Sequence, residues 1–228
     1  MSNTIISSKS KAIVSPEAKK NEFQFTNSWF DIARNVWDQL IPSINPSKIL
    51  EIGSFEGAST CYLIQKLAIQ KSIEIHCVDT WAGGIEHQSG GMAEVNMNDV
   101  ESRFTHNIKV ATDSVPNQVN LIKHKGFSDF QLSKLLASGK DNYFDFIYVD
   151  GSHQAPDVLC DAILSFRLLK VGGVIAFDDY LWSEDLPYGN DPIRSPKMAI
   201  DSFTNIYCRK MRIISAPLYQ LYIEKIDN

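Results

Sequence analysis

The sequence predicts an α/β fold built on a seven-stranded, mostly parallel sheet whose last strand is antiparallel. Three observations predict it. Apolar runs with the length of buried strands alternate along the chain with segments of helical periodicity. The first run leads through a glycine-containing turn into a helix, and acidic residues follow three of the later runs. The last two runs alternate apolar and polar residues around a turn that contains Pro217, which is typical of a terminal hairpin.

Composition and charge narrow the possible partners. The chain has 228 residues, which suits one α/β domain. Its net charge of −5 disfavours a nucleic-acid partner, because nucleic acids are bound by basic surfaces. No apolar run approaches the length of a membrane span, and four cysteines without a C-x-x-C pair are typical of free thiols in a reducing compartment. We therefore expect a cytoplasmic protein that binds neither nucleic acid nor membrane.

The chain divides into three expected segments. Residues 1–20 are rich in Ser and Lys, lack the apolar core of a secretory signal, and should form a flexible tail. An N-terminal helix is expected over residues 21–44. The main domain should cover residues 45–228, because all the expected strands lie there.

The N-terminal helix is predicted from apolar and aromatic residues that recur at helical spacing over Phe23–Leu40. Pro42 and Pro46 should end it. We expect Trp29 and Trp37 to pack against the main sheet. A helix ahead of an α/β core could also cover a site or form a homodimer contact, and the sequence leaves both open.

The first strand is expected over Ser47–Ile52 and runs directly into a turn with two glycines, followed by a helix through Leu67. Gly53 permits a tight turn, and Gly57 permits the close approach of a ligand or of the helix. The start of that helix offers free N–H groups and the positive end of the helix dipole. Two glycines alone are a weak signal, but this order of strand, turn and helix is typical of a nucleotide-type ligand site.

The second strand, expected over Ser72–Val78, is followed by Asp79. An acid in this position can hydrogen-bond a ribose diol, and the alternative for it is a helix N-cap. Residues 80–97 contain four glycines, which is typical of an active-site lid, although a plain surface loop fits almost as well. Within this loop, His87 could contact a ligand.

The remaining elements continue the alternation of strands and helices. We expect a helix over Asn98–Lys109, a strand over Val119–His124, a helix capped by Ser128, an irregular loop over 182–194, a helix that starts at Ser195-Pro196, and hairpin strands over Met211–Ser215 and Leu218–Glu224.

Two further strands, Phe144–Val149 and Val171–Phe177, flank a helix over Ala155–Lys170, and Gly172 and Gly173 mark the turn into the second of them. The strands of such a βαβ unit should be parallel neighbours whose carboxyl ends meet at one edge of the sheet. Carboxylates gathered at one edge repel one another, and a cation between them removes that repulsion. The sequence therefore predicts a metal site where α/β sheets bind ligands, and three acids follow the strands there: Asp150, Asp178 and Asp179.

These motifs resemble those of the class I S-adenosylmethionine-dependent methyltransferases. The segment Glu51–Gly57 is similar to the first motif of that family, Asp79 to its ribose-binding acid, and the terminal hairpin to its reversed last strand. The resemblance covers residues 45–225. It implies a Rossmann-like three-layer sandwich that binds S-adenosyl-L-methionine.

The resemblance also implies where the cofactor lies. Glu51 and Gly53 would line its methionine end, and Asp79 would bind the ribose. Trp81 or Phe127 would cover the adenine face. The whole expected set, in which Ser59 meets the cofactor carboxylate and Ser128 the adenine edge, is Glu51, Gly53, Ser54, Phe55, Gly57, Ser59, Asp79, Thr80, Trp81, Phe127 and Ser128.

The acidic residues resemble those of the metal-dependent O-methyltransferases of the catechol and caffeoyl-CoA type, which hold Mg²⁺ with an Asp after strand four and an Asp-Asn pair after strand five. Asp150 and Asp178 match, and Asp179 stands where Asn is usual. His153 replaces the lysine of the catechol-type enzymes and is closer to the macrolide sugar O-methyltransferases, where a His is the proposed base. The resemblance thus implies Asp150, Asp178 and Asp179 as metal ligands, with His153 and Asp150 catalytic.

The expected reaction moves the methyl group of S-adenosylmethionine to a hydroxyl of a vicinal diol on a sugar or glycosylated natural product, with Mg²⁺ or another divalent cation. A cation chelated by two adjacent hydroxyls lowers their pKa and fixes their position. His153 can then accept the proton near neutral pH, or it only forms a local hydrogen bond at a helix start. A catechol or phenolic acceptor is the nearest alternative, and a non-catalytic module that binds S-adenosylmethionine or metal is more remote. An NAD-dependent oxidoreductase is disfavoured because the glycine turn is not G-x-G-x-x-G.

Overall fold

The computed structural model describes residues 22–91 and 93–228, and the tail expected over 1–20 lies outside the described residues. The strands form a seven-stranded sheet in the order β3-β2-β1-β4-β5-β7-β6. The first five are parallel, and β7 is antiparallel to both of its neighbours, which confirms the predicted sheet. The strands are β1 (Lys48–Ile52), β2 (Ile73–Asp79), β3 (Val119–Lys125), β4 (Phe144–Val149), β5 (Leu169–Phe177), β6 (Met211–Ile214) and β7 (Leu221–Lys225).

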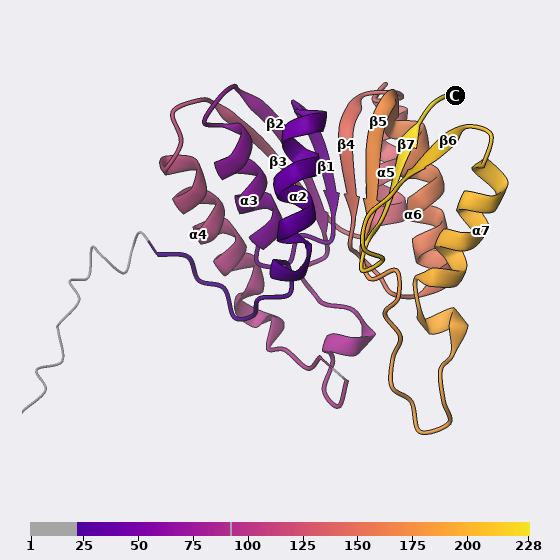
Figure 1. Cartoon of the computed structure of the whole chain (residues 1–228). Coiled ribbons are helices and arrows are strands. Elements are labelled where there is room, and N and C mark those ends of the chain that lie inside the picture. Colours follow the sequence, from indigo (N-terminus) through magenta and orange to yellow (C-terminus); the bar gives the residue numbers. More distant parts are fainter. Residues whose placement is uncertain (1–21, 92) are drawn as a thin grey trace, which may run out of the picture.

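Helices cover both faces of the sheet (Figure 1), so the expected three layers are present. One face packs against α2 (Asp31–Ile44), α3 (Ala58–Leu67) and α4 (Val100–Asp113). The other face packs against α5 (Ser128–Ala137), α6 (Ala155–Leu168) and α7 (Lys197–Tyr207). Short 3-10 turns lie in the connections: η1 (Ile85–His87), η2 (Met97–Asp99) and η3 (Pro192–Arg194). No helix in residues 22–91 and 93–228 is both long and apolar enough to cross a membrane.

Trp37 on α2 packs against the sheet, as predicted. Its ring is fully buried and meets Phe146 and Tyr148 edge-on, with centroids 5.3 and 4.9 Å away. Its indole N–H donates to the side-chain oxygen of Gln220 at 2.8 Å, so the one polar atom of the ring is satisfied. Edge-on aromatic pairs add about 0.5 to 1.5 kcal/mol to the stabilisation from burial alone. The helix α2 is therefore part of the core.

The N-terminal helix begins at Asp31, not at residue 21 or Phe23 as predicted. The segment before it is held by side chains of other elements. The Glu56 carboxylate accepts hydrogen bonds from the backbone N–H and the hydroxyl of Thr26, at 2.7 and 2.8 Å. Asn107 on α4 accepts from the Gln24 N–H at 2.6 Å. In a longer helix, the N–H groups of Gln24 and Thr26 would belong to the helix backbone, but here they donate to side chains. Helical periodicity in the sequence could not reveal these acceptors, because they lie far away along the chain.

Other boundaries also differ from prediction. Pro42 lies inside α2, which ends at Ile44 and is followed by Asn45 in a left-handed conformation (φ 47). Ser128 is the first residue of α5 and not its cap, since no side-chain capping bond forms there and extended Phe127 precedes the helix. Gly172 and its neighbour lie within β5, where the register against β4 shifts, because this strand already begins at Leu169. The bulge accommodates Gly172 at φ 84.

The two long connections, from β2 to α4 and from β5 to α7, leave the same edge of the sheet. Figure 1 shows both at the lower edge, where the parallel strands end. Ligands of open α/β sheets bind at this carboxyl edge. The topology therefore places the glycine turn, the acids and both loops around one region.

Candidate active site

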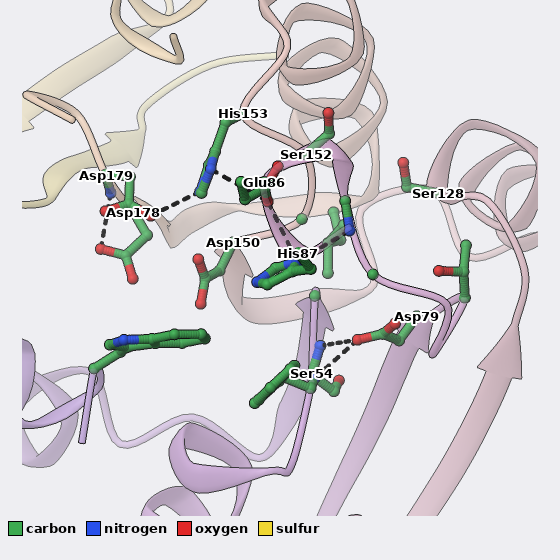
Figure 2. A pocket seen from close by; sticks show the side chains of 18 of the residues that line it. Ser54, Asp79, Glu86, His87, Ser128, Asp150, Ser152, His153, Asp178 and Asp179 are labelled. Carbon is green, nitrogen blue, oxygen red and sulfur yellow. Dashed lines mark hydrogen bonds and ion pairs between the residues drawn. The ribbon is translucent and has the colours of Figure 1, made fainter. Parts of the chain in front are cut away.

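A cavity of about 1100 Å³ opens at this edge. Its wall combines the turn after β1, the loop after β2, the segment after β4 and the acids after β5. Figure 2 shows Ser54 and Asp79 on one side of it and the acids Asp150, Asp178 and Asp179 on the other. The cavity therefore has a glycine-turn half and an acidic half.

Asp79 organises the glycine-turn half. Its carboxylate accepts the backbone N–H groups of Ser54 and Phe55, both at 2.8 Å, and that of Trp81 at 2.6 Å. Gly53 cannot carry a side chain, because a Cβ there would lie 1.8 Å from the backbone oxygen of Asp150. Ser54 lines the cavity, and its hydroxyl oxygen is buried. This geometry fits a cofactor held against a rigid turn.

Glu51 and Ser59 are turned toward each other. Glu51 is fully buried, lies outside the cavity wall and accepts from the hydroxyls of Ser59, at 2.5 Å, and Thr60. Burial raises its pKa. Ser59 lines the cavity, but its hydroxyl points to this carboxylate. Glu51, Ser59 and Thr60 form an internal network that fixes the start of α3 to β1.

Of the residues expected near the adenine, Phe127 and Ser128 line the cavity and Trp81 does not. Trp81 is 5% exposed, donates its indole N–H to the Phe55 carbonyl at 3.0 Å and packs on Phe104, so it lies in the core and not on the cavity wall. Gly57 also meets the Phe104 ring and lies outside the wall. The expected residues that do line the cavity are Gly53, Ser54, Phe55, Ser59, Asp79, Thr80, Phe127 and Ser128.

On the acidic side, Asp150, His153 and Asp179 each offer a ligand atom within 4.8 Å of the others. Asp178, expected as a third ligand, also lines the cavity, and its carboxylate accepts from the Tyr148 hydroxyl and from the Asp179 N–H, the latter at 2.9 Å. Asp179 has a left-handed backbone (φ 53). The group of converging ligand atoms thus contains Asp150 and Asp179 of the expected acids together with His153.

The charges of this group favour a cation. Burial, and then the nearby Asp178 and Asp179 carboxylates, raise the pKa of Asp150 well above its ordinary value. Burial and the Asp179 charge raise the pKa of Asp178 to about 6. A divalent cation removes this repulsion, and two carboxylates with an imidazole are donors that such ions accept. The residues present therefore fit a metal ion.

His153 lies between two carboxylates (Figure 2). Its Nε2 is 2.9 Å from an oxygen of Asp179, and its Nδ1 is 3.4 Å from an oxygen of Glu86. Burial lowers the pKa of His153, but the hydrogen bond and charge of Asp179 and the charge of Glu86 outweigh it, so the pKa is raised overall. The ring also packs on Trp182, with centroids 4.2 Å apart. Contacts with Asp179, Glu86 and Trp182 therefore fix the position of the His153 ring.

Glu86 and Trp29 are two residues of the wall that the sequence did not predict. Glu86 lies on η1 and reaches His153, and the glycine pairs that flank it in the loop were the signal for a tightly folded segment. Trp29 was expected against the sheet, but it is 50% exposed and lines the cavity. Its ring lies 5.3 Å from Phe55 and 5.8 Å from His87. His87, expected as a ligand contact, does line the cavity.

The order of the sheet, its reversed strand and the glycine turn beside an acidic group define the class I methyltransferase fold. A family profile described as a methyltransferase domain matches residues 50–180. The match covers more than half of the chain, which therefore belongs to this methyltransferase family. The predicted resemblance and the Rossmann-like fold are both confirmed.

Individual relatives are distant. The chain is similar to a caffeoyl-CoA O-methyltransferase of Populus kitakamiensis, with 23% identity over 182 residues, which are 76% of this chain and 66% of the relative. The chain spans from about half to two-thirds of the length of the curated relatives it matches. The O-methyltransferase of Bacillus cereus in complex with SAH has a TM-score of 0.55 at 18% identity, covering 93% of this chain and 83% of that one. TomG, an O-methyltransferase of Streptomyces achromogenes in complex with SAM, has a TM-score of 0.56 at 17% identity, covering 85% and 79%.

Proposed function

We propose that this chain is a divalent-cation-dependent O-methyltransferase that moves the methyl group of S-adenosylmethionine to a hydroxyl of a vicinal diol on a small molecule. The observation that carries the proposal is the group of Asp150, His153 and Asp179 at one end of a cavity whose other end is the glycine turn. Similarity to caffeoyl-CoA O-methyltransferases supports the same reaction class.

The residues of this chain would divide the work as follows. Asp79 holds the turn from Gly53 to Phe55 in the shape that receives the cofactor. Asp150 and Asp179 would hold the cation, which when bound lowers the pKa of the acceptor hydroxyl and fixes the diol. His153 is placed to take the hydroxyl proton, because its ring lies beside that group.

The acceptor is proposed to be a sugar or a glycosylated natural product, as the histidine after the first acid suggests. A catechol or other phenolic is the second candidate. It is favoured by the aromatic wall formed by Trp29, Phe55 and His87, on which a flat ring can stack. The four cysteines are free, and we propose a reducing cytoplasm as the setting.

The test is a methyl-transfer assay with the purified protein, S-adenosylmethionine and a panel of sugars and catechols, read by mass spectrometry. Each acceptor is paired with its deoxy analogue, which lacks one of the two adjacent hydroxyls. We expect methylation of intact diols that needs Mg²⁺ or Mn²⁺ and stops with EDTA. Methylation that EDTA leaves unchanged would contradict the cation role, and transfer to the deoxy analogues at an equal rate would contradict the diol.

A further inference from the structure

Glu86 is a buried acid on the loop after β2 that none of the roles above uses. The side chain is 5% exposed, and its Oε1 is buried without a hydrogen-bond partner in the described part of the chain. The Nδ1 atom of His153 is likewise buried and unpartnered there, and it lies 3.4 Å from that oxygen. Leaving a buried polar atom unpaired costs about 1 to 3 kcal/mol, so two complementary atoms at this distance call for an explanation.

We propose that Glu86 is a positioning residue for His153. Its carboxylate accepts a hydrogen bond from Nδ1–H, which fixes the rotation of the ring and directs Nε2 to the side of Asp150 and Asp179. The inference rests on the proposed function, because it assigns the orientation of the base in that reaction.

His87 does not compete for this role. Its Nδ1 lies 3.5 Å from Glu86 Oε1, but the same nitrogen accepts the N–H of Gly84 at 3.0 Å. A ring nitrogen that accepts a hydrogen bond carries no proton, so it has none to donate to the carboxylate. Of the two histidine nitrogens near Glu86 Oε1, only Nδ1 of His153 can donate a hydrogen bond to it.

The loop is built around this side chain. A Cβ at Gly84 would lie 2.5 Å from Glu86 Oε1, and one at Gly91 would lie 2.3 Å from the Glu86 backbone oxygen. That oxygen also accepts the N–H of Ala93 at 3.0 Å. Two glycines thus leave the space that the buried glutamate needs, and a plain surface loop has no such requirement.

A carboxylate on one ring nitrogen sets the role of the other. A histidine that donates Nδ1–H to an acid presents the lone pair of Nε2, the arrangement used by bases held by a carboxylate and by metal-bound histidines. Asp179 cannot serve as this partner, because it faces Nε2, which donates to its carboxylate at 2.9 Å. A cation held by Asp179 would take the place of this hydrogen bond and leave the Nε2 lone pair free. Glu86 therefore links the position of the loop to the orientation of His153.

The test compares Glu86→Ala and Glu86→Gln with Glu94→Gln. Glu94 is a matched control, because it lies on the same loop, is exposed and accepts from the Gly90 N–H at 3.0 Å. In ¹⁵N-histidine NMR spectra of neutral imidazoles recorded with Mg²⁺, we expect the Nδ1–H tautomer of His153 in the wild type and in Glu86→Gln, whose amide oxygen still accepts. We expect its loss in Glu86→Ala.

Turnover provides the second readout. Glu86→Ala should lower kcat by about 10- to 100-fold with KM for both substrates unchanged, and Glu86→Gln should recover part of it. In a His153→Ala background, Glu86→Ala should add no further loss. An unchanged tautomer, or an equal loss in the two backgrounds, would overturn the inference. The NMR readout needs no turnover, so an inactive wild type with the expected tautomer would count against the proposed function alone.

Discussion

The two halves of the cavity solve opposite electrostatic problems. In the glycine-turn half, the negative charge of Asp79 is met by three backbone N–H groups, so this half is complete within the protein. In the acidic half, Asp150 and Asp178 have raised pKa values because they are buried beside another carboxylate. The carboxylate of the first half is fully hydrogen-bonded, whereas the carboxylates of the second half repel one another. Only the second half should therefore depend on a cation.

The halves meet at one point. Gly53 ends the first strand, and the space its side chain would fill is occupied by the backbone of Asp150, which follows the neighbouring strand. The cofactor turn and the first acid of the cation group are thus packed back to back. A substitution at this contact should therefore affect both halves, whereas substitutions elsewhere should affect one half alone.

The largest effect is expected from Asp150→Asn. Removing this ligand should lower kcat by about 10³-fold, since a catalytic cation stabilises the transition state by several kcal/mol. Affinity for S-adenosylhomocysteine should not change, and thermal stability without cation should rise because a buried repulsion is removed. Steady-state kinetics and calorimetry check these results. Asp185→Asn, on the exposed loop after β5, is the control, and a matching loss of cofactor affinity in Asp150→Asn would contradict the separation.

Gly53→Ala tests the contact between the halves. Its Cβ would lie 1.8 Å from the Asp150 oxygen at φ 84, so we expect a loss of about 3 kcal/mol or more in the free energy of unfolding. Gly139→Ala is a matched control, with φ 81 and no atom within 4 Å of the new Cβ, and should cost only about 1 kcal/mol. Urea unfolding measures both, and equal losses would show that the close packing is not needed.

Asp79→Asn should loosen the turn without touching the cation group. An amide offers one acceptor oxygen in place of two, so hydrogen bonds worth about 2 kcal/mol should be lost, and the affinity for S-adenosylhomocysteine should fall by about tenfold or more. Calorimetric titration provides the measurement. Asp113→Asn removes an exposed pair with Lys109 (2.7 Å) and should change affinity and stability little. A cofactor affinity unchanged by Asp79→Asn would contradict the role of this acid.

The smallest effect concerns Asp161, a buried acid on α6. It is 1% exposed, makes no ion pair within the described ranges, and burial is the main cause that raises its pKa to about 7 from 3.8. The folded state therefore holds its proton more tightly than the unfolded chain, and wild-type stability from this group falls as pH rises from about 4 to 7. Asp161→Asn should be more stable than the wild type by about 1 kcal/mol at pH 8, with a smaller difference at pH 5. Urea unfolding at pH 5 and pH 8 measures the difference in the free energy of unfolding. Asp141→Asn, at an exposed position, is the control and should show no such dependence on pH.

The sequence predicted which elements meet at the site better than it predicted the direction of their side chains. Strand ends, glycines and the acid at Asp79 follow from local pattern, and backbone geometry then fixes where they meet. The direction of a side chain after a strand does not follow in this way. The Asp178 carboxylate accepts from the Tyr148 hydroxyl, and Glu86 reaches His153 only through the fold of its loop.

The same limit explains the differences in the N-terminal part. Helical spacing from Phe23 was present, yet hydrogen bonds donated to Glu56 and Asn107, distant in sequence, hold that segment in another conformation. Trp29 and Trp37 looked equivalent by spacing, but only Trp37 is buried in the core. The spacing of apolar residues predicts that a helix is present, whereas contacts with residues distant in sequence decide where it begins and ends.

A calorimetric titration of the purified protein with S-adenosylhomocysteine, in Mg²⁺, tests the central claim most directly. The account predicts saturable binding at one site per chain, retained in Asp150→Asn and weakened in Asp79→Asn. The absence of binding by folded protein would contradict it and would leave the acids as a cation site on an α/β scaffold without this cofactor.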